Sequence, residues 1–281
     1  MTSVMKSLYG DSTPARAALD QLWRDYVQMN PQIGQVVSAL TDLGESFLND
    51  HIALRTFDMA VSPDKDIGML KLGKIWESWG YEPRGDYIFE VKGLRARHWE
   101  HPDPDLPRVF ISELVTQKQP KIAQDAIAGL MSQLPDGFVD EPSCLWAGRR
   151  WGCDAQTWRQ LADLSEYAGW LALFGLRANH FTVDVRSLSS FKDIRGLNTW
   201  LQEMGFALND SGGQVKGSVD ICLEQSSTLA AAVEVELDDQ RVSAPGCYVE
   251  FAQRHHLPSG ELFSGFVADN ADKIFESTNR H

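Results

Sequence analysis

Positive charge is scarce in this chain, and it is nowhere concentrated. The 281 residues include 26 Lys and Arg but 39 Asp and Glu, which gives a formal net charge of −13 at pH 7. No cluster of Lys and Arg interrupts this excess of negative charge. Such a surface repels the phosphate backbone of nucleic acids and the anionic headgroups of membranes. We therefore expect neither nucleic acid nor a membrane as a partner.

Long apolar stretches are also missing. The sequence has no run of about eighteen apolar residues, the length that a membrane-spanning helix needs. Its first residues, MTSVMKSLYGDSTPARAALD, contain no apolar segment of the kind found in secretory signal peptides. From these two absences we expect a cytoplasmic protein. A hydrophobic content of 43% with 23% charged residues is ordinary for a globular chain, and we expect a single catalytic domain, 1–281.

Several common site motifs are absent as well. The cysteines form no CxxC pair, so zinc ribbons and redox dithiols have no support, and we expect reduced, buried thiols. They are Cys144, Cys153, Cys222 and Cys247. The glycines of DSGGQVKGS do not have the spacing of a phosphate-binding loop. Neither a GxSxG motif nor a Cys/His nucleophile arrangement is apparent.

What the chain does contain is one order of elements that occurs twice. In the first module, about 50–116, a strand near His51 precedes a helix from about Asp66 to Gly80, the hairpin-like DYIFEVKGLRARHWE and the strand RVFISELV. In the second, about 178–255, the strand ANHFTVDV precedes the helix SFKDIRGLNTWLQEMGF and the strands VDICLEQSS and CYVEFAQR. A glutamate lies in each closing strand, Glu113 and Glu250. We predict an α+β fold in which two βαβββ modules form a half-open β-barrel, or cup, able to hold a metal.

Further helices are expected around this cup. N-terminal helices are predicted within 13–45, where Thr13 and Pro14 read as a helix start and IGQVVSALTDLG follows Pro31. Connecting helices are predicted within 119–175, in PKIAQDAIAGLMSQLP and TWRQLADLSEYAGWLALFG, the latter ended by Gly175. We expect these connecting helices to pack on the outside of the cup. A C-terminal helix is expected over 265–278.

Strand alternation places three metal-binding side chains on one side of the sheet. Because residues two apart share a face, His51 and Arg55 point away from the helices, as do His180 and Glu250 on their own strands. Two imidazoles and one carboxylate form the facial triad that suits non-haem Fe(II). A single histidine in a strand is more often structural, but two histidines that open equivalent strands of the repeat, together with a glutamate in the last strand, favour a metal site.

Arg55 has two interpretations from the residues alone. It could form a structural ion pair with Asp184 or Glu113, or it could grip a substrate carboxylate with two hydrogen bonds. The remaining histidines are weaker candidates. His98 and His101 lie beside the proline-rich HPDPDLP and are expected to be solvated, and the histidines after the last strand are expected at the surface.

Four segments together resemble one protein family: DHIALRTF, NHFTVDV, YVEFAQR and GFVADNADKIFEST. They are similar to the 2-oxoadipate dioxygenase/decarboxylase family, also called hydroxyglutarate synthase, over about residues 15 to 278. That family resembles an elaborated member of the vicinal oxygen chelate superfamily. The resemblance implies metal ligands at His51, His180 and Glu250 and a substrate-carboxylate arginine at Arg55. The chain is shorter than the best-known bacterial members, and no residue for a second substrate carboxylate is mapped.

The chemistry that this resemblance implies is oxidative decarboxylation. A 2-oxo acid would bind Fe(II) through its keto oxygen and carboxylate, with Arg55 neutralising that carboxylate, and 2-oxoadipate and O2 would give 2-hydroxyglutarate and CO2. A role in lysine catabolism is implied too. Zn, Ni or Mn could be loaded in a purified sample. The alternatives are another metal-dependent isomerase, lyase or hydrolase of the vicinal oxygen chelate type, or a metal-free small-molecule binding protein. The oligomeric state is not predicted.

Overall fold

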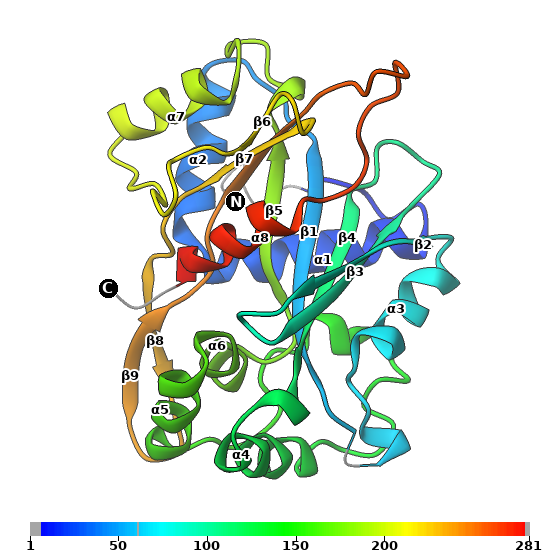
Figure 1. The fold of residues 1–281 in the computed structure, drawn as a ribbon, viewed down its shortest axis with the longest axis vertical. Coiled ribbons are helices and arrows are strands. Elements are labelled where there is room, and N and C mark those ends of the chain that lie inside the picture. The colour runs from blue at the N-terminus through cyan, green and yellow to red at the C-terminus, as the bar shows by residue number, and fades with distance from the viewer. Residues whose placement is uncertain (1–6, 61, 279–281) are drawn as a thin grey trace.

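The computed structural model describes residues 7–60 and 62–278, and its centre is one curved eight-stranded sheet (Figure 1). Its strands lie in the order β2-β3-β4-β1-β5-β10-β7-β6. The bounds of the strands are β1 Asn49–Asp58, β2 Glu82–Phe89, β3 Leu94–Glu100, β4 Arg108–Val115, β5 Ala178–Asp184, β6 Lys216–Ser218, β7 Leu223–Ser227, β8 Ala232–Glu236, β9 Arg241–Pro245 and β10 Glu250–Arg254. The helices are α1 Pro14–Met29, α2 Pro31–Asp42, α3 Met69–Ser78, α4 Lys121–Ser132, α5 Ala155–Leu164, α6 Glu166–Phe174, α7 Ile194–Glu203 and α8 Ala268–Ile274.

The strand order confirms the predicted duplication. The first half reads β2-β3-β4-β1 and the second reads β6-β7-β10-β5, so each module has the same arrangement and the two meet where β1 pairs antiparallel with β5. Within each module the first strand pairs parallel with the last, β1 with β4 and β5 with β10. One addition was not predicted. The hairpin of β8 and β9 is inserted between β7 and β10 and forms a separate two-stranded sheet.

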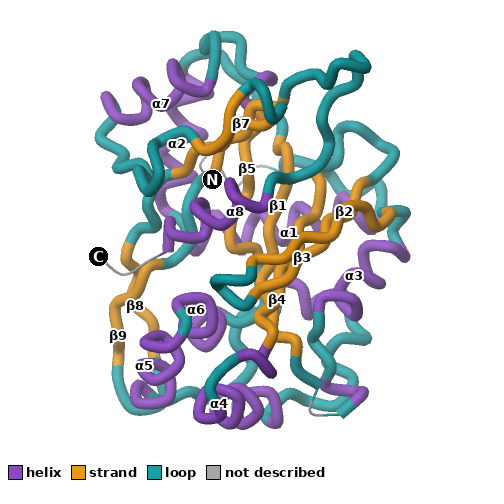
Figure 2. Tube along the Cα trace, in the orientation of Figure 1, coloured by secondary structure: helices purple, strands orange, loops and turns teal. Residues whose placement is uncertain are grey.

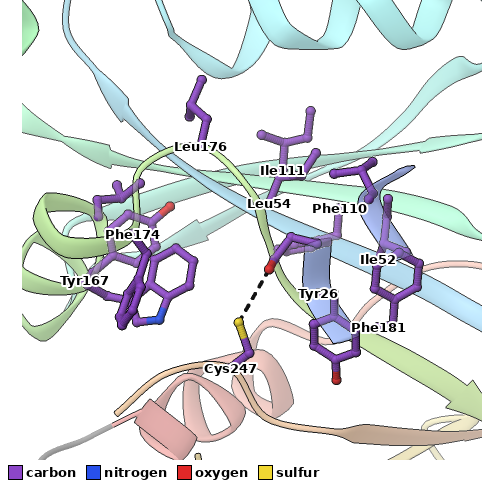
Figure 3. Close-up of a cluster of buried hydrophobic side chains, with 14 of the residues drawn as sticks. Tyr26, Ile52, Leu54, Phe110, Ile111, Tyr167, Phe174, Leu176, Phe181 and Cys247 are labelled. Atoms are coloured by element: carbon purple, nitrogen blue, oxygen red, sulfur yellow. Dashed lines mark hydrogen bonds between the residues drawn. The ribbon is translucent and has the colours of Figure 1, made fainter. Parts of the chain in front are cut away.

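The convex face of the sheet packs on the N-terminal helix. Figure 3 shows Ile52 and Leu54 of β1 beside Tyr26 of α1 and Phe181 of β5. The ring of Phe181 lies 5.2 Å from that of Tyr26 and 5.1 Å from that of Trp23. Because these apolar side chains alternate with the polar ones of β1, burying them turns His51 and Arg55 to the concave face.

The N-terminal helices confirm the predicted start signal. Thr13 precedes α1 with extended backbone, and its hydroxyl accepts a hydrogen bond from the Arg16 amide at 3.3 Å, while Pro14 occupies the first helical position. Asn30 caps α2 in the same way through the Gln32 amide at 3.1 Å. No helix in the described ranges is both long and apolar enough to span a bilayer.

Two predictions for the connecting helices are wrong. The stretch TWRQLADLSEYAGWLALFG is not one helix, because Ser165 adopts an extended backbone and its hydroxyl caps α6 at the Ala168 amide, 3.3 Å away. α6 also does not pack outside. Its side chains from Tyr167 to Phe174 are all buried, as a helix that is apolar on every side requires. Gly175 ends α6 with a φ of 66°, where a Cβ would lie 2.2 Å from the Gly148 carbonyl oxygen.

The C-terminal segment covers the concave face of the sheet. α8 begins at Ala268, later than the predicted 265, and a 3₁₀ turn from Phe275 to Thr278 follows it. The preceding residues are not helical, and Arg254 donates hydrogen bonds to the carbonyl oxygens of Phe263 and Gly265. α8 contacts strands of both modules, β2 on one side and β6 and β7 on the other. In Figures 1 and 2 it lies in front of the central strands, with α1 behind them.

Candidate active site

Three strands bring His51, His180 and Glu250 together on the concave face. Their ligand atoms all lie within 4.8 Å of one another, and each residue is buried. His51 Nε2 lies 3.5 Å from Glu250 Oε1, and His180 Nε2 lies 3.0 Å from Glu250 Oε2. The strand neighbours explain this meeting, because β5 lies between β1 and β10 and pairs with both. The three candidate ligands predicted from the sequence are therefore adjacent in space.

The glutamate of the first module plays no part in this cluster. Glu113 points to the opposite face, where it accepts the Met69 amide of α3 at 2.7 Å and pairs with Arg95. The strand register gives the reason. In the first module Ala53 of β1 pairs with Phe110 of β4, and in the second Thr182 of β5 pairs with Glu250 of β10. The counterpart of Glu250 in the first module is therefore the apolar residue Phe110. Within the described ranges the duplicated fold thus carries one His/His/Glu cluster, and it lies between the modules.

Neighbouring oxygen atoms set the tautomer of both imidazoles. His51 Nδ1 lies 2.8 Å from Asp50 Oδ1, and His180 Nδ1 lies 3.1 Å from Asn179 Oδ1. Both partners are acceptors, so each Nδ1 carries the proton and each Nε2 keeps its lone pair, although His51 Nε2 also lies 3.1 Å from the Thr182 hydroxyl oxygen. Burial lowers the pKa of His180, which favours its neutral form. This donor set suits a divalent metal ion, because His180 Nε2 has no hydrogen-bond partner in the described part of the chain and faces a carboxylate oxygen.

A buried ion pair supports the first histidine from behind. Asp50 takes two hydrogen bonds from Arg254, at 2.6 and 2.9 Å, and both side chains are buried. Burial alone would raise the pKa of Asp50, but Arg254 and His51 outweigh it and hold the pKa well below its usual range. Sequence reasoning missed this pair. A signal was present, however, since Asp50 and Asn179 each directly precede a histidine of the cluster.

We expect Asp50→Asn to weaken metal binding by about 10–100-fold, the usual effect of removing such a partner of a metal-bound histidine. Stability should fall as well, because Arg254 loses its charged partner in a buried position. Metal titration and urea unfolding measure the two effects. The matched control is Asp58→Asn, an acid on the same strand that pairs with Arg95 at 3.1 Å, away from the cluster. Equal metal affinity in both variants would contradict the supporting role of Asp50.

Arg55 lines the same pocket as the three candidate ligands. Its Nη1 donates to Glu166 Oε1 and its Nη2 to Thr278 Oγ1, both at 3.1 Å. Its guanidinium also packs on the rings of Tyr167 and Trp170, with centroids at 5.0 and 5.1 Å. Neither ion-pair partner named from the sequence is used, since Asp184 pairs with Arg186 and Glu113 with Arg95. Sequence reasoning missed Glu166, because nothing in a helical segment indicates which strand it will face.

His98 and the cysteines have structural environments. His98 is buried, not solvated as predicted, because Tyr87 and Glu100 each lie 3.0 Å from one of its ring nitrogens. Both nitrogens are thus paired, and His98 has none left for a metal. His256 is exposed, as predicted. The four cysteines are free and buried, which confirms the expectation from their spacing.

The cup of paired βαβββ modules has the fold expected of the vicinal oxygen chelate type, and among the described residues it holds a His/His/Glu cluster. Its fold matches that of a glyoxalase-superfamily protein from Ralstonia eutropha JMP134, with a TM-score of 0.78 at 20% identity over 94% of this chain and 93% of that one. The chain belongs to the 2-oxoadipate dioxygenase/decarboxylase family, whose model matches residues 1–139 and 129–263. The family is one of oxygenase enzymes, as the sequence resemblance predicted.

Relatives from plants carry the name of this family. The chain is 33% identical to the 2-oxoadipate dioxygenase/decarboxylase of Arabidopsis thaliana and 31% identical to that of Oryza sativa subsp. japonica, covering 94% of this chain in both cases and 77% and 78% of the relatives. The structure of the Oryza sativa hydroxyglutarate synthase in complex with 2-oxoadipate matches with a TM-score of 0.85 at 31% identity, over 93% of this chain and 91% of that one. The crystal structure of a Shewanella frigidimarina protein matches with a TM-score of 0.85 at 43% identity, over 92% of this chain and 100% of that one.

The prediction of a cytoplasmic protein is wrong by this comparison. The Arabidopsis relative is named chloroplastic and the rice relative chloroplastic/amyloplastic. The inference failed because an apolar N-terminal segment distinguishes secreted proteins from others and does not separate the cytosol from an organelle.

Proposed function

We propose that this chain is a non-haem Fe(II)-dependent dioxygenase/decarboxylase of 2-oxo dicarboxylic acids, with 2-oxoadipate as its substrate. The convergence of His51, His180 and Glu250 beside Arg55 in one buried pocket is the observation that carries the proposal. The rice relative that binds 2-oxoadipate supports the choice of substrate. The balanced reaction takes 2-oxoadipate and O2 to 2-hydroxyglutarate and CO2. A role in lysine catabolism stays a prediction.

In this proposal His51, His180 and Glu250 hold the ion on one side and leave its other positions free. When bound, Fe(II) supplies sites for the keto and carboxylate oxygens of the substrate and activates O2. Gln225 orients the carboxylate ligand, because its Nε2 donates to Glu250 Oε1 at 2.7 Å and leaves Oε2 to face His180. These hydrogen bonds hold the ligand set before any substrate arrives.

Arg55 binds the substrate carboxylate in this proposal and neutralises its charge as C1 leaves as CO2. The acidic surface does not prevent a dianion from binding, because the local field decides. Asp50 is neutralised by Arg254, so the ion and Arg55 together outweigh Glu250 and Glu166. Phe266 and Phe275 form apolar walls of the pocket and exclude water from the reacting end of the substrate.

Oxygen uptake by the Fe(II)-loaded protein across 2-oxo acids of different chain length tests the proposal. We expect uptake with 2-oxoadipate to exceed that with the other acids, with one CO2 released for each O2 consumed. Labelled O2 should place one oxygen atom in the new carboxylate of 2-hydroxyglutarate and the other in its hydroxyl group. Turnover without oxygen uptake, with Zn, Ni or Mn, would instead identify an isomerase, lyase or hydrolase. Protein purified without chelators that contains no metal would identify a binding protein.

A further inference from the structure

Buried polar atoms without a hydrogen-bond partner gather in the candidate active site. Among the described residues, five such atoms belong to side chains that line this pocket. They are Arg55 Nε, Asn179 Nδ2, His180 Nε2, Gln225 Oε1 and Tyr248 Oη. Folded proteins pair nearly all buried polar groups, because an unpaired group has lost its water without replacement. A concentration of unpaired groups in one pocket therefore marks where a bound molecule supplies the missing partners.

In the proposed function a bound metal would pair with His180 Nε2 and a substrate carboxylate with Arg55 Nε. Neither role accounts for the unpaired hydroxyl of Tyr248. This residue precedes β10 and shares the face of Glu250, two positions further on. Its ring packs on that of His180, with centroids 4.7 Å apart and planes tilted by 32°. Its backbone carbonyl oxygen accepts the Tyr26 hydroxyl at 2.6 Å, which holds the residue from the outer side. The phenol oxygen is thus held in the pocket, and phenylalanine would fill the same space.

The phenol lines the same pocket as the metal cluster and the guanidinium of Arg55. Three of the unpaired atoms are hydrogen-bond donors: Arg55 Nε, Asn179 Nδ2 and Tyr248 Oη. Donors that converge from several elements on one pocket match the oxygens of an anion, and a 2-oxo carboxylate presents such oxygens next to the metal.

We propose that Tyr248 is a substrate-binding residue, whose hydroxyl donates a hydrogen bond to the 2-oxo carboxylate group that Arg55 also contacts. This inference rests on the proposed function and adds a residue to it. The hydroxyl contributes nothing to packing that a phenylalanine ring would lack, and it has no hydrogen-bond partner within residues 7–60 and 62–278. Its role therefore begins when substrate binds, and it selects for a 2-oxo acid over an apolar molecule of the same shape.

The test is Tyr248→Phe in the full-length, Fe(II)-loaded protein. We expect KM for 2-oxoadipate to rise about tenfold or more, the effect of losing one hydrogen bond to a charged group. Calorimetric titration with 2-oxoadipate in the absence of O2 should show the same loss in affinity without any turnover. Metal content and melting temperature should stay equal to those of the wild type, because the hydroxyl that is removed had no partner.

The matched control is Tyr81→Phe, another buried tyrosine, whose hydroxyl donates to the Pro107 carbonyl oxygen at 3.1 Å outside the pocket. It should lower the melting temperature and leave KM unchanged. If Tyr248→Phe keeps the wild-type KM and affinity while the wild type binds and oxidises 2-oxoadipate, this inference is overturned alone. If the wild type neither binds 2-oxoadipate nor consumes O2 with it, the proposed function and this inference fail together.

Discussion

If His51 is a metal ligand, as proposed, His51→Ala should abolish metal binding and turnover while the protein still folds. The imidazole contributes one of three ligands, and the two that remain do not complete a facial triad. The strands and helices build the cup without the ion, so secondary structure should persist. We expect metal content to fall from about one equivalent to near zero and kcat/KM to fall by roughly a thousandfold or more. Glu250→Gln, which keeps the shape of the side chain, should behave in the same way.

Elemental analysis, oxygen uptake and circular dichroism measure these three quantities. The melting temperature of the metal-loaded protein should also fall toward that of the metal-free protein, because the variant no longer gains stability from ligand binding. His98→Ala provides the matched control. His98 is also a buried strand histidine, but both its nitrogens are paired within the protein. It should lose stability and keep its metal. A His51→Ala protein with normal metal content and turnover would remove His51 from the site.

Arg55→Lys raises KM for a 2-oxo acid by about tenfold or more while metal content stays near normal. Lysine keeps the charge but cannot make the two parallel hydrogen bonds of a guanidinium to a carboxylate. The surroundings of Arg55 add a second effect. Lysine also loses the bonds to Glu166 and Thr278 and the planar contact with Tyr167, so the melting temperature should fall. Kinetics and thermal unfolding on one protein measure both.

Glu166→Gln separates the two roles of Arg55. It removes the counter-ion, at 3.1 Å from the guanidinium, and leaves every donor of Arg55 in place. If Arg55 binds substrate, KM should stay the same or decrease, because a competing carboxylate charge has gone, while stability falls. If Arg55 is only structural, both Arg55→Lys and Glu166→Gln should lower the melting temperature and leave KM unchanged. That second pattern would exclude Arg55 from the substrate site.

Much of the fold could be predicted because its signals are local. Alternation with a period of two placed His51 and Arg55 on one face of β1, and the repeated element order predicted the paired modules. The start of α1 could be predicted because Thr13 caps the helix through a short-range hydrogen bond. Local signals also misled: the apolar character that marked α6 as a helix gave no indication that Ser165 would divide the segment or that the helix would be buried. That the whole chain acts as one catalytic domain stays a prediction.

The sequence by itself determined which residue types could form a metal site and which face of each strand carries them. The sequence also selected Glu250 as the candidate carboxylate. Only the tertiary structure showed why Glu113 is not its counterpart, because the register between neighbouring strands puts Phe110 at the equivalent place. The pair of Asp50 with Arg254 and the contacts of Arg55 with Glu166 and Thr278 join residues more than a hundred positions apart. Periodicity along a chain encodes the direction of a side chain, but its partners are set by how distant elements pack against one another.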